Sequence, residues 1–297
     1  MIRPPRLKMR DAVAVVAPAG PVPREGFARG EAVLARHYDV VYTDRVFDRR
    51  GFLAGDDAAR LAELRRAIAD PQIRAVVCAR GGYGIMRLLP GLDPALLLND
   101  PKPIVGFSDI TALHAWAAHA GVASVHGPVV TQLGTLEEDD AASLFALLES
   151  PSPPPPLSGL TVLAHGRGEG RLAGGNLEMV TSLVGTPWAF QLDGAVLLLE
   201  EIGERPYRID RALTQLLLSG AFDRVAGVVL GDFVRCADTD DAAPSAIDVI
   251  GERLAPLGIP VVSGAPIGHG TRNRAVPHGA LVRLEGPTLT FLESAVS

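Results

Sequence analysis

The first half of the chain alternates short apolar runs with amphipathic segments, and this alternation constrains the fold more than any other feature. Residues 11–20, 73–84 and 102–109 each carry an uninterrupted apolar run that is followed within two residues by glycine. Residues 22–38 and 55–70 have the pattern of helices. Strands that are apolar along their whole length are buried on both faces, as in parallel sheets covered by helices. The pattern therefore predicts an α/β domain built on a parallel sheet.

A proline-rich segment divides the chain. Its sequence ESPSPPPPLSGL, from Glu149 to Leu160, can form neither a helix nor a central strand, because proline lacks the backbone donor. We therefore expect a linker over residues 149–164, between a domain of residues 1–148 and a domain of residues 165–297. After the linker, strands and helices alternate less regularly, which predicts an α+β domain with a mixed strand order.

Composition excludes several classes of protein. With 297 residues, 47% of them hydrophobic, the chain can form two cores and is not disordered. A net charge of −6 without a long basic cluster argues against nucleic acid as a partner. We expect no membrane span and no signal peptide. Cys78 and Cys236 are expected to be reduced thiols, and no Cys/His cluster has zinc spacing, so we expect a cytoplasmic protein without a metal.

The segment PIVGFSDITALH places Ser108 between a strand and a helix. Functional groups of open α/β sheets collect at the carboxyl ends of the strands. A serine there can act as a nucleophile, with the N–H groups at the start of the helix holding an oxyanion. A Gly-x-Ser-x-Gly elbow would need glycine where Ile110 stands. On the local sequence alone, a plain helix N-cap is therefore the favoured interpretation of Ser108.

Other strand ends could complete a site around this serine. The glycine-rich loop of residues 81–84 could donate an N–H group to an anion, or it could be a simple tight turn. His269 lies in a glycine-rich loop after a strand, where histidine is a candidate base. Glu200 and Glu201 end another apolar strand, and only one of them can face the site. The alternative is that both lie in water beyond the strand.

Serine, glutamate and histidine then follow one another in the chain, each at a strand end, as in a hydrolase triad. The chain resembles the serine LD-carboxypeptidase family, which includes murein tetrapeptide carboxypeptidases and microcin C immunity hydrolases. The resemblance rests on segments that keep the family order over nearly the whole chain: VVAPAG, ARGGYGIMRLLP, PIVGFSDITALH, HGP, GGNLEMVTSLVGTPW, LLLEEIGERPYRIDRALTQLLLSG and PIGHGTRNRAVPHG. It implies a flavodoxin-like N-terminal domain, a smaller β-rich α+β C-terminal domain, and a site between them.

The resemblance also implies roles for individual residues. Ser108 would be the nucleophile, Glu200 the acid and His269 the base, without metal or cofactor. The backbone N–H groups of Gly82 and Asp109 would form the oxyanion hole. The family pattern itself lacks glycine two residues after the serine, so the residue at position 110 no longer counts against the nucleophile. Glu201 stays open as an alternative acid.

The substrate implied by the resemblance is a murein tetrapeptide with a C-terminal D-alanine, cleaved by a cytoplasmic homodimer during recycling of wall peptides. Such a site must hold a free carboxylate, and Arg80 and Arg272 are candidate cations that the sequence does not assign. A microcin-type hydrolase is an alternative, with Trp188 or a loop tyrosine stacking on the base of an aminoacyl- or peptidyl-adenylate analogue. A ligand-binding α/β protein without activity is another.

Overall fold

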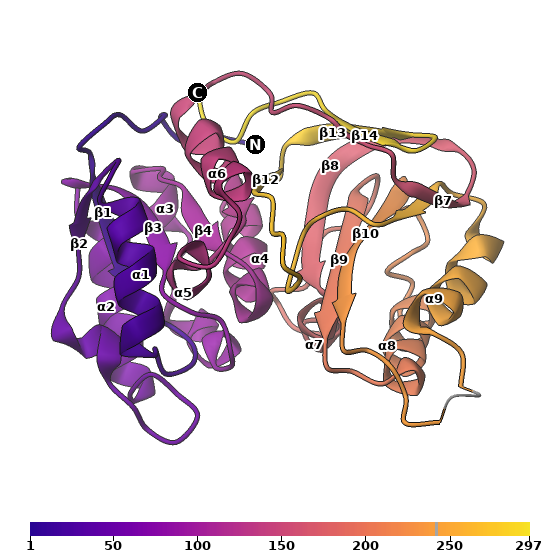
Figure 1. Cartoon of the computed structure of the whole chain (residues 1–297), viewed down its shortest axis with the longest axis horizontal. Helices are drawn as coiled ribbons and strands as arrows, with labels where there is room; N and C mark the ends of the chain where they lie inside the picture. The colour runs from indigo at the N-terminus through magenta and orange to yellow at the C-terminus, as the bar shows by residue number, and fades with distance from the viewer. Residues whose placement is uncertain (241–242) are drawn as a thin grey trace.

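The computed structural model describes residues 1–240 and 243–297, which form two α/β domains lying side by side (Figure 1). The first domain contains β1 (Ala12–Val16), α1 (Arg24–Leu34), β2 (Asp39–Val41), α2 (Asp57–Ala69), β3 (Ile73–Cys78), α3 (Ala95–Asn99), β4 (Ile104–Gly106), α4 (Thr111–His119), β5 (Ser124–His126), α5 (Val130–Leu133) and α6 (Glu138–Glu149). The second contains β6 (Leu157–Ser158), β7 (Thr161–Ala164), β8 (Arg167–Asn176), α7 (Leu177–Ser182), β9 (Val196–Ile202), α8 (Pro206–Leu218), β10 (Gly227–Val234), α9 (Ala246–Leu254), β11 (Val261–Ser263), β13 (Leu281–Glu285) and β14 (Thr288–Phe291).

The first sheet has the strand order β12-β5-β4-β3-β1-β2, where β12 is Val276–His278. Strands β1 to β5 are parallel, in the order of a flavodoxin-like fold. Alternate residues of its strands enter two separate cores: Val76 packs with α2 and α4, whereas Val77 packs with α1 and α6. The expected parallel sheet with two covered faces is therefore confirmed, and its cause is the continuous apolar character of the strands.

The second sheet is mixed, as expected, with the order β6-β14-β13-β8-β9-β10-β11-β7. Strands β8 to β11 pair in parallel, and the outer strands pair antiparallel, including the hairpin of β13 and β14. The helices α7, α8 and α9 pack on one face of this sheet. None of the helices in the described residues combines the length and the apolar character that crossing a membrane requires.

The chain passes between the two sheets more than once. Residues 153–156, the proline run, lie outside any helix or strand. The two strands that follow the run, β6 and β7, fall inside the segment expected to be a linker. They join the second sheet by pairing with β14 and β11. Strand β12 returns to the first sheet and pairs antiparallel with β5. Ser297 also bonds back to the N-terminal segment, where its N–H donates to Pro4 O at 2.9 Å.

Three fully buried histidines lie where β12 meets the first sheet. The rings of His114 and His278 stack with centroids 5.1 Å apart, and His126 lies 5.9 Å from His114. The two ring nitrogens of His114 contact Ser124 Oγ at 2.8 Å and the carbonyl oxygen of Gly106 at 2.9 Å. Burial lowers the pKa of His114 to about 4 and lowers the pKa values of His126 and His278 well below their usual range. The fold therefore holds all three in the neutral form.

These histidines are expected to make the protein sensitive to acid. The unfolded chain binds protons on them below about pH 6.5 while the folded chain does not, so stability falls as pH falls, by up to about 1.4 kcal/mol per pH unit for each ring. Burial raises the pKa of Asp109 to about 6 and raises that of Glu201, which works in the opposite direction. We expect a net loss of about 3 kcal/mol between about pH 7.5 and about pH 5.

Urea unfolding at a series of pH values measures this loss. In His278→Phe, unfolding should be coupled to the uptake of up to one proton fewer. The slope of the unfolding free energy against pH should therefore be smaller by up to about 1.4 kcal/mol per pH unit, whatever the change in stability at neutral pH. A wild-type stability that stays constant from about pH 7.5 to about pH 5 would contradict the neutral histidine cluster.

Candidate active site

Ser108 lies in a strained turn between β4 and α4. Its φ angle is +65°, which is left-handed and uncommon for a residue with a β-carbon. Residues Ser108–Ile110 form a 3₁₀ turn that leads directly into α4, and no side-chain hydrogen bond caps either segment. The N-cap interpretation, favoured on local sequence, is therefore wrong. The left-handed backbone turns the Ser108 side chain towards Gly81 instead of towards the helix N–H groups.

The glycine-rich loop after β3 packs directly against this turn. A β-carbon placed on Gly81 would lie 2.9 Å from Ser108 Cβ and 3.0 Å from Ser108 Oγ, so a residue larger than glycine would collide with the serine. Gly20 N, after β1, donates to Gly81 O at 3.0 Å. The loops after β1, β3 and β4 thus lie together at the carboxyl end of the sheet, where the sequence pattern placed them. Gly82, with φ of +115°, is the next residue along.

The Asp109 side chain ties the serine turn to the same loop. Its Oδ2 accepts a hydrogen bond from the Ile85 N–H at 3.0 Å, and the carboxyl group is buried. Burial raises its pKa to about 6, against the lowering effects of that hydrogen bond and of Arg60. The buried Arg60 of α2 donates to the carbonyl oxygens of Pro18 and Gly84. Asp109 and Arg60 therefore hold the glycine loop in place beside Ser108. No local sequence pattern indicates this role for Arg60.

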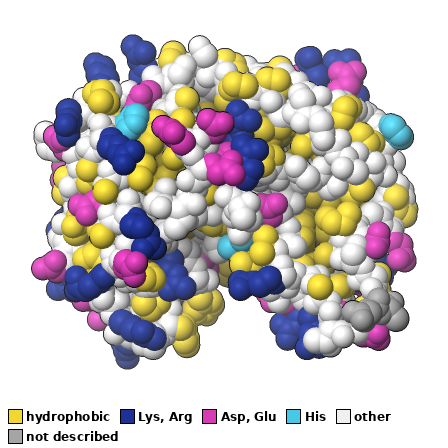
Figure 2. Space-filling model, in the orientation of Figure 1, with side chains coloured by type: hydrophobic (Ala, Val, Ile, Leu, Met, Phe, Trp, Pro, Cys, Tyr) yellow, Lys and Arg dark blue, Asp and Glu magenta, His cyan; other side chains and the backbone are white. Residues whose placement is uncertain are grey.

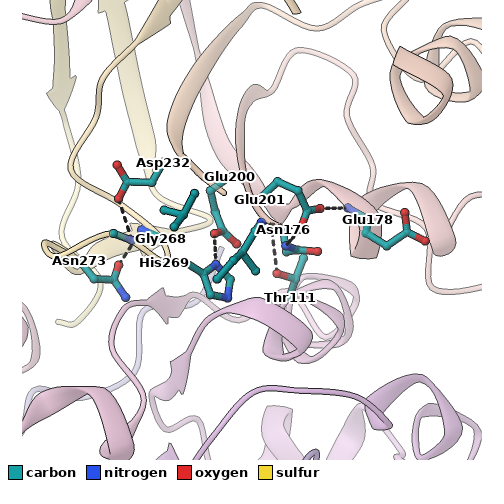
Figure 3. A network of polar contacts seen from close by, with 12 residues as sticks. Thr111, Asn176, Glu178, Glu200, Glu201, Asp232, Gly268, His269 and Asn273 are labelled. Atoms are coloured by element: carbon teal, nitrogen blue, oxygen red, sulfur yellow. Dashed lines mark hydrogen bonds and ion pairs between the residues drawn. The ribbon is translucent and has the colours of Figure 1, made fainter. Parts of the chain in front are cut away.

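Glu200 and His269 form a buried pair in the second domain. His269 Nδ1 lies 2.6 Å from Glu200 Oε2, and the side chains are 15% and 0% exposed. Glu200 belongs to β9, and His269 lies in the loop of residues 264–275 between β11 and β12. With Nδ1 on the carboxylate, Nε2 is at the opposite side of the ring, which extends below Glu200 towards the first domain (Figure 3). A carboxylate on Nδ1 is the arrangement that orients a histidine base.

The histidine lies beside the serine turn. The rings of His269 and Phe107, the residue before Ser108, have centroids 4.7 Å apart. Figure 2 shows a hollow between the two domains at the lower edge of the molecule, with a histidine side chain at its inner end. Within the described residues, no hydrogen bond joins Ser108 Oγ to His269. Such contacts commonly tighten only when substrate is bound.

Glu201 faces the other side of β9 and has different partners. It accepts hydrogen bonds from Asn176 Nδ2 at 2.9 Å, the Glu178 N–H at 2.9 Å and its neighbour Ile202 N–H at 2.8 Å (Figure 3). Asn176 N in turn donates to Thr111 Oγ1 of α4 at 3.0 Å. Glu201 thus holds the start of α7, while Glu200 holds His269. Both glutamates are buried, so the alternative that they lie in water is wrong.

A third carboxylate lies close to the histidine. Asp232 of β10 accepts a hydrogen bond from the Gly270 N–H at 3.2 Å. Burial raises its pKa, and the nearby Glu200 adds to the rise, while His269 lowers it. No group of three or more His, Cys, Asp or Glu side chains in the part of the chain that the structure describes could hold a metal ion.

The candidate cations and the aromatic residue have other contacts. Arg80 donates to Pro21 O at 2.5 Å, on the surface. Arg272 binds the buried Asp140 through two hydrogen bonds of 2.9 and 3.2 Å. Trp188 is partly buried against the first-domain core, with its ring 5.8 Å from His119. Among the described contacts, none of these three side chains forms a hydrogen bond or ring contact with Ser108 or His269.

Comparison with known proteins matches both domains. Residues 13–127 match the LD-carboxypeptidase N-terminal domain, and residues 169–284 match the LD-carboxypeptidase C-terminal domain. Murein tetrapeptide carboxypeptidase of Pseudomonas aeruginosa is 35% identical over 295 residues, with 94% of each chain covered.

Solved structures agree with this assignment. Muramoyltetrapeptide carboxypeptidase from Oxalobacter formigenes superposes with a TM-score of 0.83 at 31% identity, over 94% of this chain and 97% of that one. Microcin C7 self immunity protein MccF, in complex with aspartyl sulfamoyl adenosine, superposes with a TM-score of 0.89 over 100% of both chains at 22% identity, which shows a shared fold. The chain therefore belongs to the LD-carboxypeptidase family, and it is a carboxypeptidase-type hydrolase.

Proposed function

We propose that the protein is a serine peptidase that removes the C-terminal D-alanine from murein tetrapeptides. The observation that carries the proposal is the buried 2.6 Å contact between Glu200 and His269, next to the strained turn of Ser108. The Pseudomonas and Oxalobacter relatives, named for murein or muramoyl tetrapeptides, support the substrate class.

In the proposed reaction, His269 Nε2 takes the proton of Ser108 Oγ as Oγ attacks the carbonyl carbon of the L-centred diamino acid. The N–H groups of Gly82 and Asp109 hold the resulting oxyanion. His269 then gives the proton to the nitrogen of the leaving D-alanine, and the C–N bond breaks. Water hydrolyses the acyl-enzyme by the same two proton transfers. Glu200 stabilises the imidazolium in both halves of the cycle.

The strained turn supports the role of Ser108. A left-handed, non-glycine residue costs roughly 1–3 kcal/mol and persists only where the surrounding structure enforces it. Here Asp109 and the glycine loop enforce it. The turn presents the hydroxyl beyond the strand end and leaves the N–H groups that follow it free of a serine cap.

A direct assay tests the proposed function. Pure protein is incubated with L-Ala-D-Glu-meso-diaminopimelate-D-Ala, and separately with a peptidyl-adenylate analogue, each with and without EDTA. We expect D-alanine release that EDTA does not affect. Loss of activity in EDTA would contradict a metal-free mechanism. Cleavage of only the adenylate analogue would indicate the microcin-type activity, and binding of the peptide without cleavage would indicate a ligand-binding protein.

We also propose that the enzyme is a cytoplasmic homodimer that acts in recycling of wall peptides. The support is the family resemblance. Sedimentation velocity at several concentrations tests the assembly, since a single species of monomer mass throughout would contradict the dimer. Fractionation of cells that produce the protein tests the location.

A further inference from the structure

The backbone around His269 has little freedom to move. Gly268 has φ of +122°, and a β-carbon on it would lie 2.7 Å from Glu200 Oε2. The loop of residues 264–275 therefore packs its backbone directly on the carboxylate that His269 contacts. A small shift of this backbone would change both the Glu200 contact and the direction of the imidazole. Something must fix Gly268, since a glycine by itself is the most flexible residue.

Two side-chain amides fix both polar groups of Gly268. Its N–H donates to Asn273 Oδ1 at 3.0 Å, and its carbonyl oxygen accepts from Gln132 Nε2 at 3.4 Å. Asn273 Nδ2 donates to Gln132 Oε1 at 2.7 Å, which closes a cycle. We call Gly268, Asn273 and Gln132 the amide ring. Each amide both donates and accepts within it, so neither side chain can be reversed without losing hydrogen bonds.

Asn273 is itself anchored. It is 0% exposed, and its backbone N–H donates to Asp140 Oδ2 at 3.2 Å. Asp140 is also fully buried and is paired with Arg272. A buried amide and a buried carboxylate are costly unless their hydrogen bonds are made, and here they are made to the loop that carries His269.

The ring joins the two domains at the site. Gln132 is in α5 and Asp140 is in α6, so both come from the domain that carries Ser108. Glu200 comes from the second domain. The His269 loop is thus held on one side by the Glu200 carboxylate of the second domain. On the other side it is held by Gln132 and Asp140, from the domain that carries Ser108. Figure 3 shows Asn273 on the opposite side of Gly268 from Glu200.

We propose that Asn273 is a positioning residue. It acts with Gln132 to hold the backbone at His269 at the distance from Ser108 that proton transfer requires. This inference rests on the proposed function, because it assigns Asn273 a part in the same proton transfer. Asn273 does not touch the reacting atoms. It acts through Gly268, whose position sets the distance between imidazole and hydroxyl.

The test is Asn273→Ala, with two readouts. We expect kcat for D-alanine release to fall roughly 10- to 100-fold with KM within about twofold, because a displacement of the base by about 1 Å has this effect. The rate at which a fluorophosphonate probe modifies Ser108 should fall in parallel. Gln132→Ala should have a similar effect, and the double variant should lose little more than either single variant, since the ring acts as a unit.

Tyr38→Phe is a matched control. It removes a partly buried hydrogen bond, 2.9 Å long, from the hydroxyl of the buried Tyr38 to Glu149, away from the site. We expect it to lower the melting temperature without changing kcat or probe labelling. An Asn273→Ala protein that is folded at the assay temperature, with kcat and labelling rate within about twofold of wild type, would overturn the inference.

The two readouts separate this inference from the proposed substrate. A wild-type protein that reacts with the probe but releases no D-alanine would contradict the proposed function, and the labelling rates would then decide on Asn273. If the wild type releases D-alanine but is not labelled by the probe, the comparison of kcat between wild type and Asn273→Ala decides on the role of Asn273. If neither reaction occurs, both proposals fail.

Discussion

Ser108→Ala is expected to lower kcat for D-alanine release by roughly 10⁴- to 10⁶-fold, with the protein still folded. The substitution removes the oxygen that attacks in the proposed reaction and keeps the β-carbon, so the packing of that carbon against Gly81 remains. Quantification of free D-alanine over long incubations measures the loss. Ser219→Ala, at the end of α8, is a control of the same chemistry and should keep full activity. Turnover within about tenfold of wild type would remove Ser108 from the mechanism.

Ser108→Gly distinguishes a strained nucleophile from an ordinary turn residue. Glycine adopts the +65° φ angle without the cost that a β-carbon adds, so this variant should be inactive yet more stable than Ser108→Ala by about 1 kcal/mol. Urea unfolding of the two variants measures the difference. Equal or lower stability of the glycine variant would show that the turn stores no strain.

Glu200→Gln is expected to lower kcat by roughly 10³- to 10⁴-fold. The amide has the size of the carboxylate but carries no charge, so it cannot stabilise the imidazolium that forms in the proposed reaction, in which His269 takes the Ser108 proton. The NH₂ group of the glutamine can also donate to Nδ1. This favours the tautomer that carries its proton on Nε2, which cannot accept the serine proton. The comparison of kcat between wild type and variant at a pH where wild type is fully active measures this effect.

Glu201→Gln is the matched variant on the adjacent residue. Glu201 accepts three hydrogen bonds and none of them comes from His269. Replacing one acceptor oxygen by an NH₂ group opposes these donors, so we expect a stability loss of about 1–3 kcal/mol with kcat reduced far less than in Glu200→Gln. If Glu201→Gln had the larger effect on kcat, the assignment of Glu200 as the acid would be wrong.

Much of the fold could be predicted from the sequence because its causes are local. The apolar strands at 12–16 and 73–78 have no polar face, and only a parallel sheet with helices on both sides can bury them. Asp56 caps α2 through its own side chain, accepting from the Ala59 N–H at 2.8 Å, and aspartate is among the residues that favour this position. The proline run excludes helix and strand by its own chemistry.

Other features could not be predicted in this way because they depend on residues far apart in the chain. The short strands β6 and β7 lie within the segment that was expected to be a linker. They could not be predicted, because a strand of two to four residues forms only where the edge of a neighbouring strand offers hydrogen-bond partners. Asn273, four residues after His269, carries no local signal of its role. Its partners Gln132 and Asp140 lie more than a hundred residues earlier.

The sequence by itself determined the α/β class, the strand ends at which functional residues gather, and the chemical types available there: a hydroxyl, two carboxylates and an imidazole. Periodicity and backbone chemistry act over a few residues, so they can be read along the chain. Only the tertiary structure decided which glutamate contacts His269, that Ser108 is held in a left-handed turn and does not cap a helix, and that amides from both domains fix the histidine loop. These are matters of distance and direction between segments, and they are set when the two sheets pack together.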